Sequence, residues 1–369
     1  MLINFDHVSG QKHLRYFLDN AFQSNRLGHS FLLHGPDGVG KLAVALAFSK
    51  ALLCEADAER ACNSCKHCKQ VAALAHPGIT LIFPHPKAAK IEELVRVNES
   101  VASNPYCMER AWPGSLISID RIRKLKKDLG FRSFEGRSRL IIINDMHMMT
   151  AEATNSLLKI LEEPPEKTCF LLITTKLSGL LPTIISRCQQ LRFDPLQPDE
   201  IETGLREKET GSKTHDYELI SRLAGGSMRR AFRLMEDGFS EKKSLATDIL
   251  RTAFKKPSNR AAFATELANS NDKFVIREML GFILLWLRDA MYISCLGDAS
   301  DSSQLVNLDQ RESLFKFVKS LPDFDYEHAM TEVDRSMLML DRHVQPALVL
   351  TVMMRNLASP AVAAGVDAS

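Results

Sequence analysis

The sequence lacks an uninterrupted apolar segment of the about twenty residues that a membrane-spanning helix requires. Its first residues, Met1 to Asp6, also lack the positively charged segment followed by an apolar one that marks a secretory signal. The formal net charge of +2 is too small to indicate nucleic-acid binding by itself, so any such binding depends on local clusters of basic side chains. We therefore expect a soluble, cytoplasmic protein with no membrane partner.

A phosphate-binding loop in this chain lacks one essential hydroxyl group. Residues 35–42 read Gly-Pro-Asp-Gly-Val-Gly-Lys-Leu and lie between an apolar segment and an alanine-rich helical segment, which is the context of a P-loop. In such a loop, backbone N–H groups bind phosphates and the lysine reaches the outer phosphates. The next residue is normally Ser or Thr, whose hydroxyl holds Mg²⁺, but here it is Leu42. Candidate nucleotide-binding residues are Gly35, Gly38, Gly40, Lys41 and Leu42.

A carboxylate is missing from a second motif of the same site. Leu140–Ile143 reads as a buried strand that is followed by Asn144 and Asp145. A Walker B strand ends in an aspartate that binds Mg²⁺ and a glutamate that polarises the attacking water. If the alignment shifts by one residue, Asp145 becomes the metal ligand and Met146 replaces the base. In either alignment one carboxylate is absent, so we expect no competent hydrolysis, no Mg²⁺ and only weak ATP binding, if any.

Length and composition are those of an ordinary globular protein. The 369 residues are enough for two or three domains. Hydrophobic residues make up 45% of the chain and charged residues 25%, with a mean hydropathy of −0.11.

Four of the eight cysteines are clustered in a pattern that is typical of a metal site. Their spacing is C-x7-C-x2-C-x2-C, and the short steps let the thiolates converge on one tetrahedral ion. A disulfide framework is the weaker interpretation in a reducing cytosol. His67 is an alternative ligand inside the cluster, but four thiolates already close the site, which predicts a structural zinc. The predicted ligands are Cys54, Cys62, Cys65 and Cys68.

The remaining cysteines occur singly, and an inert thiol is the default interpretation for each of them. They are Cys107, Cys169, Cys188 and Cys295.

Apolar strands alternate with helical patterns as far as about residue 193, which indicates a parallel sheet flanked by helices. The cysteine cluster falls between the P-loop helix and the next strand, so it is an insertion. Residues 84–116 are expected to form an extended loop or lobe of unknown role, in which breaks at His85-Pro86-Lys87 and Asn104-Pro105 flank a charged helical stretch. The expected strands are Phe31–His34, Ile79–Phe83, Leu140–Ile143, Phe170–Thr174 and Gln190–Phe193.

Helical periodicity replaces the strand signals after Phe193. Residues 195–200 read as a linker into a helix with Asp199 at its N-cap. We expect an α/β domain at 1–194, a small helical domain at 195–239 and a larger helical domain at 240–369. The apolar segments in the last domain are explained by core packing or by a subunit contact.

Several short segments occur in the order found in one protein family. Residues 5–11 (Phe-Asp-His-Val-Ser-Gly-Gln) precede the P-loop and the cysteine cluster. Residues 155–165 (Asn-Ser-Leu-Leu-Lys-Ile-Leu-Glu-Glu-Pro-Pro) and 186–188 (Ser-Arg-Cys) follow. This set resembles the clamp-loader ATPases of the AAA+ class, which belong to bacterial DNA polymerase III. The resemblance implies a RecA-like domain, a helical lid and a helical collar.

The resemblance also implies partners and distinguishes between members of the family. The implied partners are the gamma/tau and delta clamp-loader subunits, the sliding clamp and primer–template DNA. The gamma/tau motor is expected to carry Ser or Thr at the position of Leu42 and an Asp-Glu pair at Asn144-Asp145. The chain therefore resembles a non-hydrolysing, stator-like subunit, and an active motor is the alternative.

Three side chains acquire roles through the resemblance. Arg187 corresponds to an arginine finger that reaches the ATP site of a neighbouring subunit, where its permanent charge stabilises phosphoryl transfer. Arg229 corresponds to a nucleotide sensor in the lid, and Thr174 or Thr175 to a sensor of the γ-phosphate. The simpler alternatives are a salt-bridged surface arginine, an arginine at a helix start and a residue that ends a strand.

A basic helix is expected at residues 121–129. Ile122, Leu125 and Leu129 share one face of this helix, which leaves the basic side chains toward solvent. Clamp loaders contact the DNA backbone with helices of this domain, so the basic face is a candidate DNA-binding surface, with a merely solvated face as the alternative. No aromatic residue is interleaved to stack on bases. The basic residues are Arg123, Lys124, Lys126 and Lys127.

Overall fold

The computed structural model describes residues 2–6, 8–24, 27–56, 59–109, 111–112, 114–130, 138–208, 217–235, 239–297 and 304–363. The chain divides into two units, Met1–Arg233 and Leu234–Ser369, which are described separately below.

A five-stranded parallel sheet forms the centre of the first unit, in the order β4-β5-β6-β2-β7. This confirms the predicted parallel sheet, and each observed strand ends within two residues of the bounds expected from the sequence. The strands are β2 (Ser30–His34), β4 (Ile79–Ile82), β5 (Arg139–Ile143), β6 (Thr168–Thr174) and β7 (Gln189–Arg192).

Strand β2 lies between β6 and β7, and its register places the P-loop at one edge of the sheet. Phe31 pairs with Leu171 and His34 with Thr174, so the carboxyl ends of both strands lie side by side. Asn144 follows the end of β5 at this edge. The carboxyl ends of parallel strands are where ligands bind in open α/β sheets, so the topology brings the two altered motifs together.

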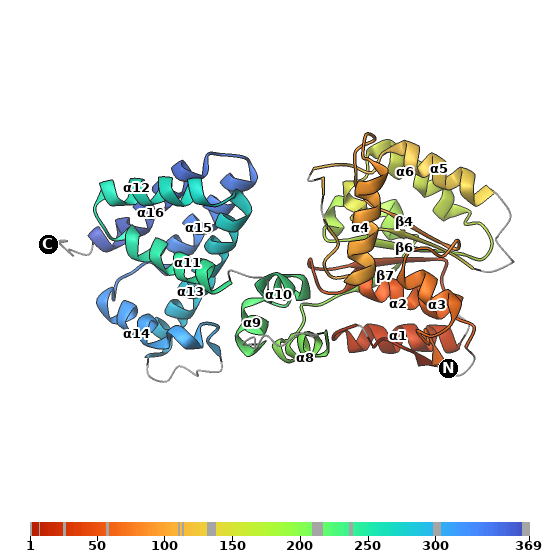
Figure 1. Ribbon diagram of the computed structural model, residues 1–369, viewed down its shortest axis with the longest axis horizontal. Coiled ribbons are helices and arrows are strands. Elements are labelled where there is room, and N and C mark those ends of the chain that lie inside the picture. Colours follow the sequence, from red (N-terminus) through yellow and green to blue (C-terminus); the bar gives the residue numbers. More distant parts are fainter. Residues whose placement is uncertain are drawn as a thin grey trace. The chain divides into compact units, whose positions relative to one another are not determined.

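Helices cover both faces of this sheet, with α5 and α6 on one face and α1 and α2 on the other (Figure 1). The largest core cluster packs α5 and α6 against β5 and β6 and includes Ile122, Leu125 and Leu157. On the opposite side, α2 is buried along almost its whole length. The helices are α1 (Lys12–Gln23), α2 (Lys41–Leu53), α3 (Lys66–Ala72), α4 (Ile91–Ser103), α5 (Ile119–Gly130), α6 (Ala151–Glu162) and α7 (Pro182–Ile185).

Short elements complete the α/β part of this unit. Strand β1 (Leu2–Ile3) pairs in parallel with β3 (Glu59–Arg60) as a separate two-stranded sheet. The described residues of this part include the 3₁₀ turns η2 (Met146–Met148) and η3 (Leu177–Gly179). At the start of α6, the Thr150 hydroxyl accepts a hydrogen bond from the Ala153 N–H, which caps the helix.

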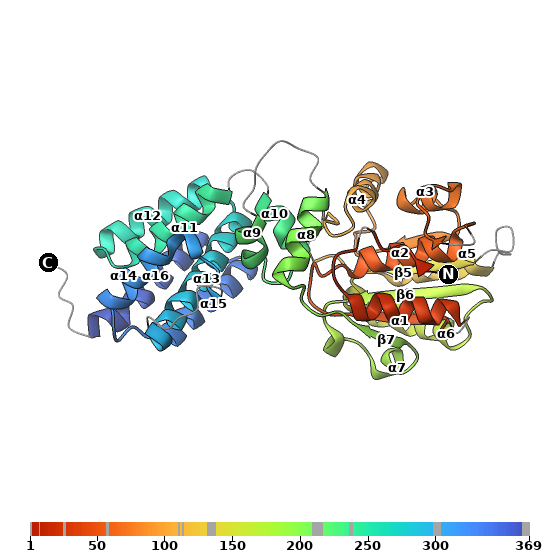
Figure 2. The same ribbon diagram turned by 90° about the horizontal axis from the view of Figure 1, so that it is seen from below.

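Three helices follow the sheet and lie side by side (Figure 2). They are α8 (Pro198–Lys208), α9 (Tyr217–Leu223) and α10 (Met228–Met235). The prediction that Asp199 is an N-cap was wrong, because α8 begins at Pro198, the residue before Asp199, and so places Asp199 in its first turn. A carboxylate at this position is favourable because it faces the unpaired N–H groups at the helix start.

The described part of the second unit is helical. Helix α13 contacts α11, α14 and α15, and α16 contacts α11, α12 and α15. Part of α13, Val275–Leu296, is long and apolar enough to cross a membrane, but 56% of its most apolar window is buried inside the structure. The elements are α11 (Phe239–Ala253), α12 (Pro257–Ser270), α13 (Lys273–Leu296), η6 (Leu308–Gln310), α14 (Arg311–Ser320), α15 (Tyr326–Asp341) and α16 (Pro346–Ala363).

Candidate functional site

The P-loop connects β2 to α2 and has the backbone that its glycines predict. Gly38 and Gly40 have φ values of 78° and 95°, in the region that favours glycine. Added Cβ atoms would collide with neighbours, at 2.1 Å from the Ser227 hydroxyl for Gly38 and at 2.9 Å from the Tyr106 ring for Gly40. The loop is therefore in close contact with two segments that lie far away in the sequence.

Lys41 points back into its own loop. Its ammonium group donates a hydrogen bond of 2.8 Å to the Gly35 carbonyl and another to the Pro36 carbonyl, and the residue is only 6% exposed. Leu42, in the position of the magnesium hydroxyl, is equally buried. The positive charge of Lys41, which would attract the phosphates of a nucleotide, is thus already hydrogen-bonded to carbonyl groups of the loop.

Both altered motifs line one pocket together with Lys41 and Arg229. Asn144 donates a hydrogen bond of 3.1 Å to the Asp145 carboxylate. Thr174 is buried, with its hydroxyl 3.2 Å from His147 Nδ1, and the neighbouring Thr175 lines the pocket instead.

Arg229, at the start of α10, is buried against the P-loop. Its guanidinium donates to the Asp37 carboxylate at 3.2 and 3.3 Å, and to the Met108 carbonyl at 2.5 Å. The family resemblance implied a nucleotide-sensing role for this arginine, with a helix-start arginine as the alternative, and the structure places Arg229 both at the start of α10 and in the lining of the P-loop pocket. Its partners in the structure are protein groups, which the sequence did not indicate.

Arg187 lies outside the P-loop pocket. Arg187 is not among the described residues that line that pocket. It follows α7, and its guanidinium lies 2.8 Å from the Glu162 carboxylate and donates to the Thr183 carbonyl at 3.0 Å. Its side chain is 36% exposed. The charge is therefore accessible from outside the subunit.

Cys188, beside Arg187, is a packing residue. Its side chain belongs to the core cluster around α6, and burial raises the pKa of its thiol to about 11. The thiol is therefore protonated at neutral pH and is a poor nucleophile.

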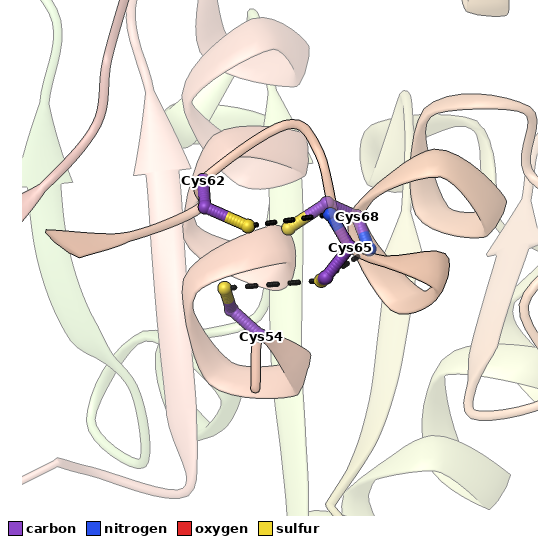
Figure 3. Close-up of side chains that lie close together, drawn as sticks. All are labelled: Cys54, Cys62, Cys65 and Cys68. Atoms are coloured by element: carbon purple, nitrogen blue, oxygen red, sulfur yellow. Dashed lines mark hydrogen bonds between the residues drawn. The ribbon is translucent and has the colours of Figure 1, made fainter. Parts of the chain in front are cut away.

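The four clustered cysteines converge on one point (Figure 3). Their sulfur atoms all lie within 4.8 Å of one another, and the Cys54 and Cys65 sulfurs are 4.0 Å apart. Zinc–thiolate bonds of about 2.3 Å in a tetrahedron imply sulfur–sulfur distances of about 3.8 Å, so the cluster fits such an ion. Backbone N–H groups of Cys65 and Cys68 lie 3.4 Å from the sulfurs of Cys62 and Cys65, an arrangement that supports thiolate ligands.

His67 does not join this cluster but contacts His76 and Glu55. His76 Nδ1 accepts the Gly78 N–H at 2.9 Å, so His76 carries its proton on Nε2 and donates it to His67 Nδ1 at 2.8 Å. The remaining nitrogen of His67 then donates to Glu55 at 2.9 Å. This chain of hydrogen bonds connects α3 to the residues just before β4.

The basic residues of α5 are exposed, as the amphipathic pattern predicted. Ile122, Leu125 and Leu129 are buried against the sheet. Arg123 also lies 3.7 Å from Asp120. The exposed basic residues are Arg123, Lys124, Lys126 and Lys127.

The family of this chain follows from a match that covers much of the first unit. A family model described as DNA polymerase III, delta subunit, matches residues 10–197, slightly more than half of the 369 residues. The chain belongs to the DNA polymerase III delta subunit family. The clamp-loader membership that the sequence motifs predicted is confirmed.

Relatives of this family member include both delta′ and tau subunits. DNA polymerase III subunit delta′ of Bacillus subtilis is 32% identical over 234 residues, 63% of this chain and 62% of the relative. Subunit tau of the same organism is 31% identical over 252 residues, 67% of this chain and 39% of the relative. Subunit tau of Escherichia coli is 28% identical over 241 residues, 64% of this chain and 33% of the relative. The chain thus spans less than two thirds of the length of these relatives.

Among solved structures, a gamma subunit-related protein from Thermotoga maritima aligns with 93% of this delta-family chain and 99% of its own. The identity is 15% and the TM-score is 0.38.

Several residues at these sites were not predicted from the sequence. Pro105, Tyr106 and Met108 line the P-loop pocket, and Glu162 pairs with Arg187. The only sequence signal for the first three was the Asn104-Pro105 break, which has no periodicity to predict a contact. Glu162 lay inside a recognised motif, but nothing in the spacing indicated its partner.

Proposed function

We propose that this chain is a delta′-type, non-hydrolysing subunit of a bacterial replicative clamp loader. In this role it acts as a stator and contributes Arg187 to the ATP site of a neighbouring subunit while the sliding clamp is loaded onto primed DNA. The observation that carries the proposal is the place of Arg187. It lies outside the chain's own P-loop pocket, and its side chain is 36% exposed.

Absence of hydrolysis is supported by the chemistry of the P-loop pocket. Leu42 offers an alkyl group where a magnesium ligand is needed, and Asn144 offers a neutral amide next to Asp145. Phosphoryl transfer depends on a metal ion that neutralises the developing charge and on a group that orients the attacking water. This pocket supplies neither set of ligands in full.

The arginine finger is supported by its chemistry and by its anchorage. A guanidinium group is permanently charged and binds phosphate oxygens through a planar fork of donors. At the end of α7, Nη1 of Arg187 donates to the Thr183 carbonyl and Nη2 lies 2.8 Å from the Glu162 carboxylate, which fixes the orientation of the guanidinium. The side chain is still 36% exposed, so we expect the phosphates of a nucleotide on a neighbouring subunit to meet the exposed part of this group.

We assign zinc to the four cysteines as a structural ion. Four thiolates complete a tetrahedral coordination sphere, which leaves no position for a substrate. Such a site contributes its binding free energy to folding rather than to catalysis. The ligands are Cys54, Cys62, Cys65 and Cys68.

The assembly implied by this role has a lid at residues 195–239 and an oligomerisation collar at 240–369. We propose that its partners are gamma/tau and delta subunits, the sliding clamp and primer–template DNA, all in the cytoplasm. The exposed basic face of α5 is the candidate DNA contact, because phosphate contacts need cationic side chains and no base-specific geometry.

An active motor of the gamma/tau type is the second candidate function. It is favoured by one finding, the 31% identity to a tau subunit over 252 residues. A motor of this kind needs the metal ligands that Leu42 and Asn144 replace.

The two functions are separated by reconstitution. We expect the chain to co-purify with gamma/tau and delta subunits, and the assembly to hydrolyse ATP in the presence of clamp and primed DNA. The chain alone is expected to show negligible steady-state turnover. Turnover by the isolated chain at the rate of an AAA+ motor would support the motor instead.

A further inference from the structure

A short segment between α4 and α5 lies against the P-loop. Tyr106 is 3% exposed, and its ring is the closest neighbour of Gly40, the residue from which α2 begins. The Tyr106 hydroxyl accepts a hydrogen bond of 2.8 Å from the Ser9 N–H. In a nucleotide-binding P-loop, the start of this helix is where phosphate oxygens meet backbone N–H groups. An aromatic side chain is therefore seated beside the phosphate position.

The same segment also contacts helices α8 and α10. The Lys208 ammonium lies 4.7 Å from the centroid of the Tyr106 ring and 5.2 Å from that of Phe232, and it donates to Asn104 at 3.4 Å. The Met108 carbonyl accepts a hydrogen bond from Arg229. Burial lowers the pKa of Lys208, which is consistent with an ammonium group enclosed between aromatic rings.

Little space remains between these groups. The pocket lined by Lys41, Asn144 and Arg229, together with Pro105, Tyr106 and Met108 of this segment, holds about 40 Å³. Ligand pockets typically measure about 300–1,000 Å³. The cationic groups are also engaged, since Lys41 binds carbonyls of its own loop, and Arg229 binds Asp37 and Met108. A nucleotide would have to displace protein atoms and exchange both sets of hydrogen bonds.

We propose that residues 104–108 occupy the nucleotide site of this chain, with Tyr106 as the residue that determines whether the P-loop accepts a nucleotide. The segment contacts the P-loop through Tyr106, α8 through Lys208 and α10 through Arg229. This gives a role to part of the lobe at 84–116. The inference deepens the proposed function by explaining how the pocket is closed, and it does not depend on Arg187.

If residues 104–108 close the pocket, nucleotide affinity depends on the fraction of molecules in which the segment has left the pocket. If the segment leaves the pocket only a small fraction of the time, the apparent dissociation constant is raised by the reciprocal of that fraction. Minor conformations are typically populated at about 0.1–10%. Removing the Tyr106 ring is therefore expected to tighten binding at least about tenfold.

The test is equilibrium binding of a fluorescent ATP analogue to the isolated full chain. Wild-type protein is expected to show no saturable binding up to about 1 mM, the upper end of ordinary substrate affinities. Tyr106→Ala is expected to bind, and Lys41→Ala in the same background is expected to abolish that binding. Tyr16→Ala, which removes a tyrosine that is 72% exposed on α1, is the matched control and is expected to behave as wild type.

Two results would overturn the proposal. One is ordinary micromolar binding by the wild-type chain, and the other is a folded Tyr106→Ala variant that still does not bind. If Tyr106→Ala does not fold, Lys208→Ala is the second variant, because it removes the contacts to Tyr106 and Asn104 from outside the pocket. If Lys208→Ala binds the ATP analogue no better than wild type, that result counts against the proposal. Because no partner subunit is present, these outcomes are independent of whether Arg187 serves a neighbour.

Discussion

The Arg187 guanidinium and the Glu162 carboxylate are 2.8 Å apart, and this ion pair joins two motifs separated in the sequence. Glu162 is the last residue of α6, and Arg187 follows α7, which packs against α6. Both side chains are substantially exposed, at 36% for Arg187 and 47% for Glu162. The pair therefore orients the arginine without burying it.

Replacing Arg187 with alanine is expected to leave folding and assembly intact and to lower ATP hydrolysis by the assembled clamp loader. An arginine finger contributes about 10³–10⁵ in rate at a single site. The loss in total hydrolysis is smaller, because sites served by other subunits still turn over. Steady-state ATPase and clamp-loading assays measure both effects, and clamp loading is expected to suffer more.

The matched control for this variant is Arg192→Ala. Arg192 is also exposed and is paired with a single carboxylate, that of Asp194 at 3.2 Å. It is expected to have no effect on hydrolysis. Normal clamp loading by an assembled Arg187→Ala complex would show that Arg187 is not a finger.

Glu162→Gln is expected to change the free energy of unfolding by less than about 1 kcal/mol, because exposed ion pairs contribute about 0–1 kcal/mol. Its effect on hydrolysis by the assembled loader should lie between wild type and Arg187→Ala, since the amide still accepts a hydrogen bond from the guanidinium. Denaturant unfolding and the ATPase assay measure the two quantities. A loss as large as that of Arg187→Ala would show that the carboxylate does more than orient its partner.

About one zinc ion per chain is expected in protein purified without added metal. Cys65→Ser should remove it, and the segment that carries the cysteines should become sensitive to proteases, because binding of a structural zinc contributes directly to folding. Elemental analysis and limited proteolysis are the measurements. Cys295→Ser, which changes an exposed thiol in the second unit, should retain the metal. A fully folded, metal-free native chain would contradict the assignment.

The isolated chain is expected to hydrolyse ATP no faster than its Lys41→Ala variant, with or without Mg²⁺. The reason is that Leu42 and Asn144 remove ligands of the metal on which phosphoryl transfer depends. A coupled ATPase assay at saturating ATP measures the rate. Metal-dependent turnover that Lys41→Ala abolishes would favour the motor function.

Lys124→Ala combined with Lys127→Ala is expected to weaken binding of the assembled loader to primed DNA. Each lost phosphate contact should reduce the slope of log K against log salt by about 0.9. Anisotropy titrations at several salt concentrations measure this slope. Lys255→Ala combined with Lys256→Ala removes two exposed lysines of the second unit as the control. Equal salt dependence in both variants would identify the α5 face as merely solvated.

The sequence by itself determined the parallel sheet, the amphipathic face of α5 and the cysteine cluster. Each depends on local spacing. Continuous apolar segments specify buried parallel strands, a 3.6-residue period specifies one buried helix face, and short C-x2-C steps bring thiolates together. For this reason the bounds of the strands expected from the sequence agree with the observed bounds to within two residues. Altered catalytic positions, such as Leu42, were also visible because a motif specifies which side chain belongs at each position.

Tertiary structure alone decided what fills the P-loop pocket and what holds Arg187. Tyr106 is 66 residues from Gly40, and Lys208 is 102 residues from Tyr106, yet all three meet in one place. No periodicity or spacing encodes such a contact, because it arises where the sheet edge, the 84–116 lobe and helices α8 and α10 happen to converge. The same holds for Glu162 and Arg187, whose charges meet only because α7 packs against α6.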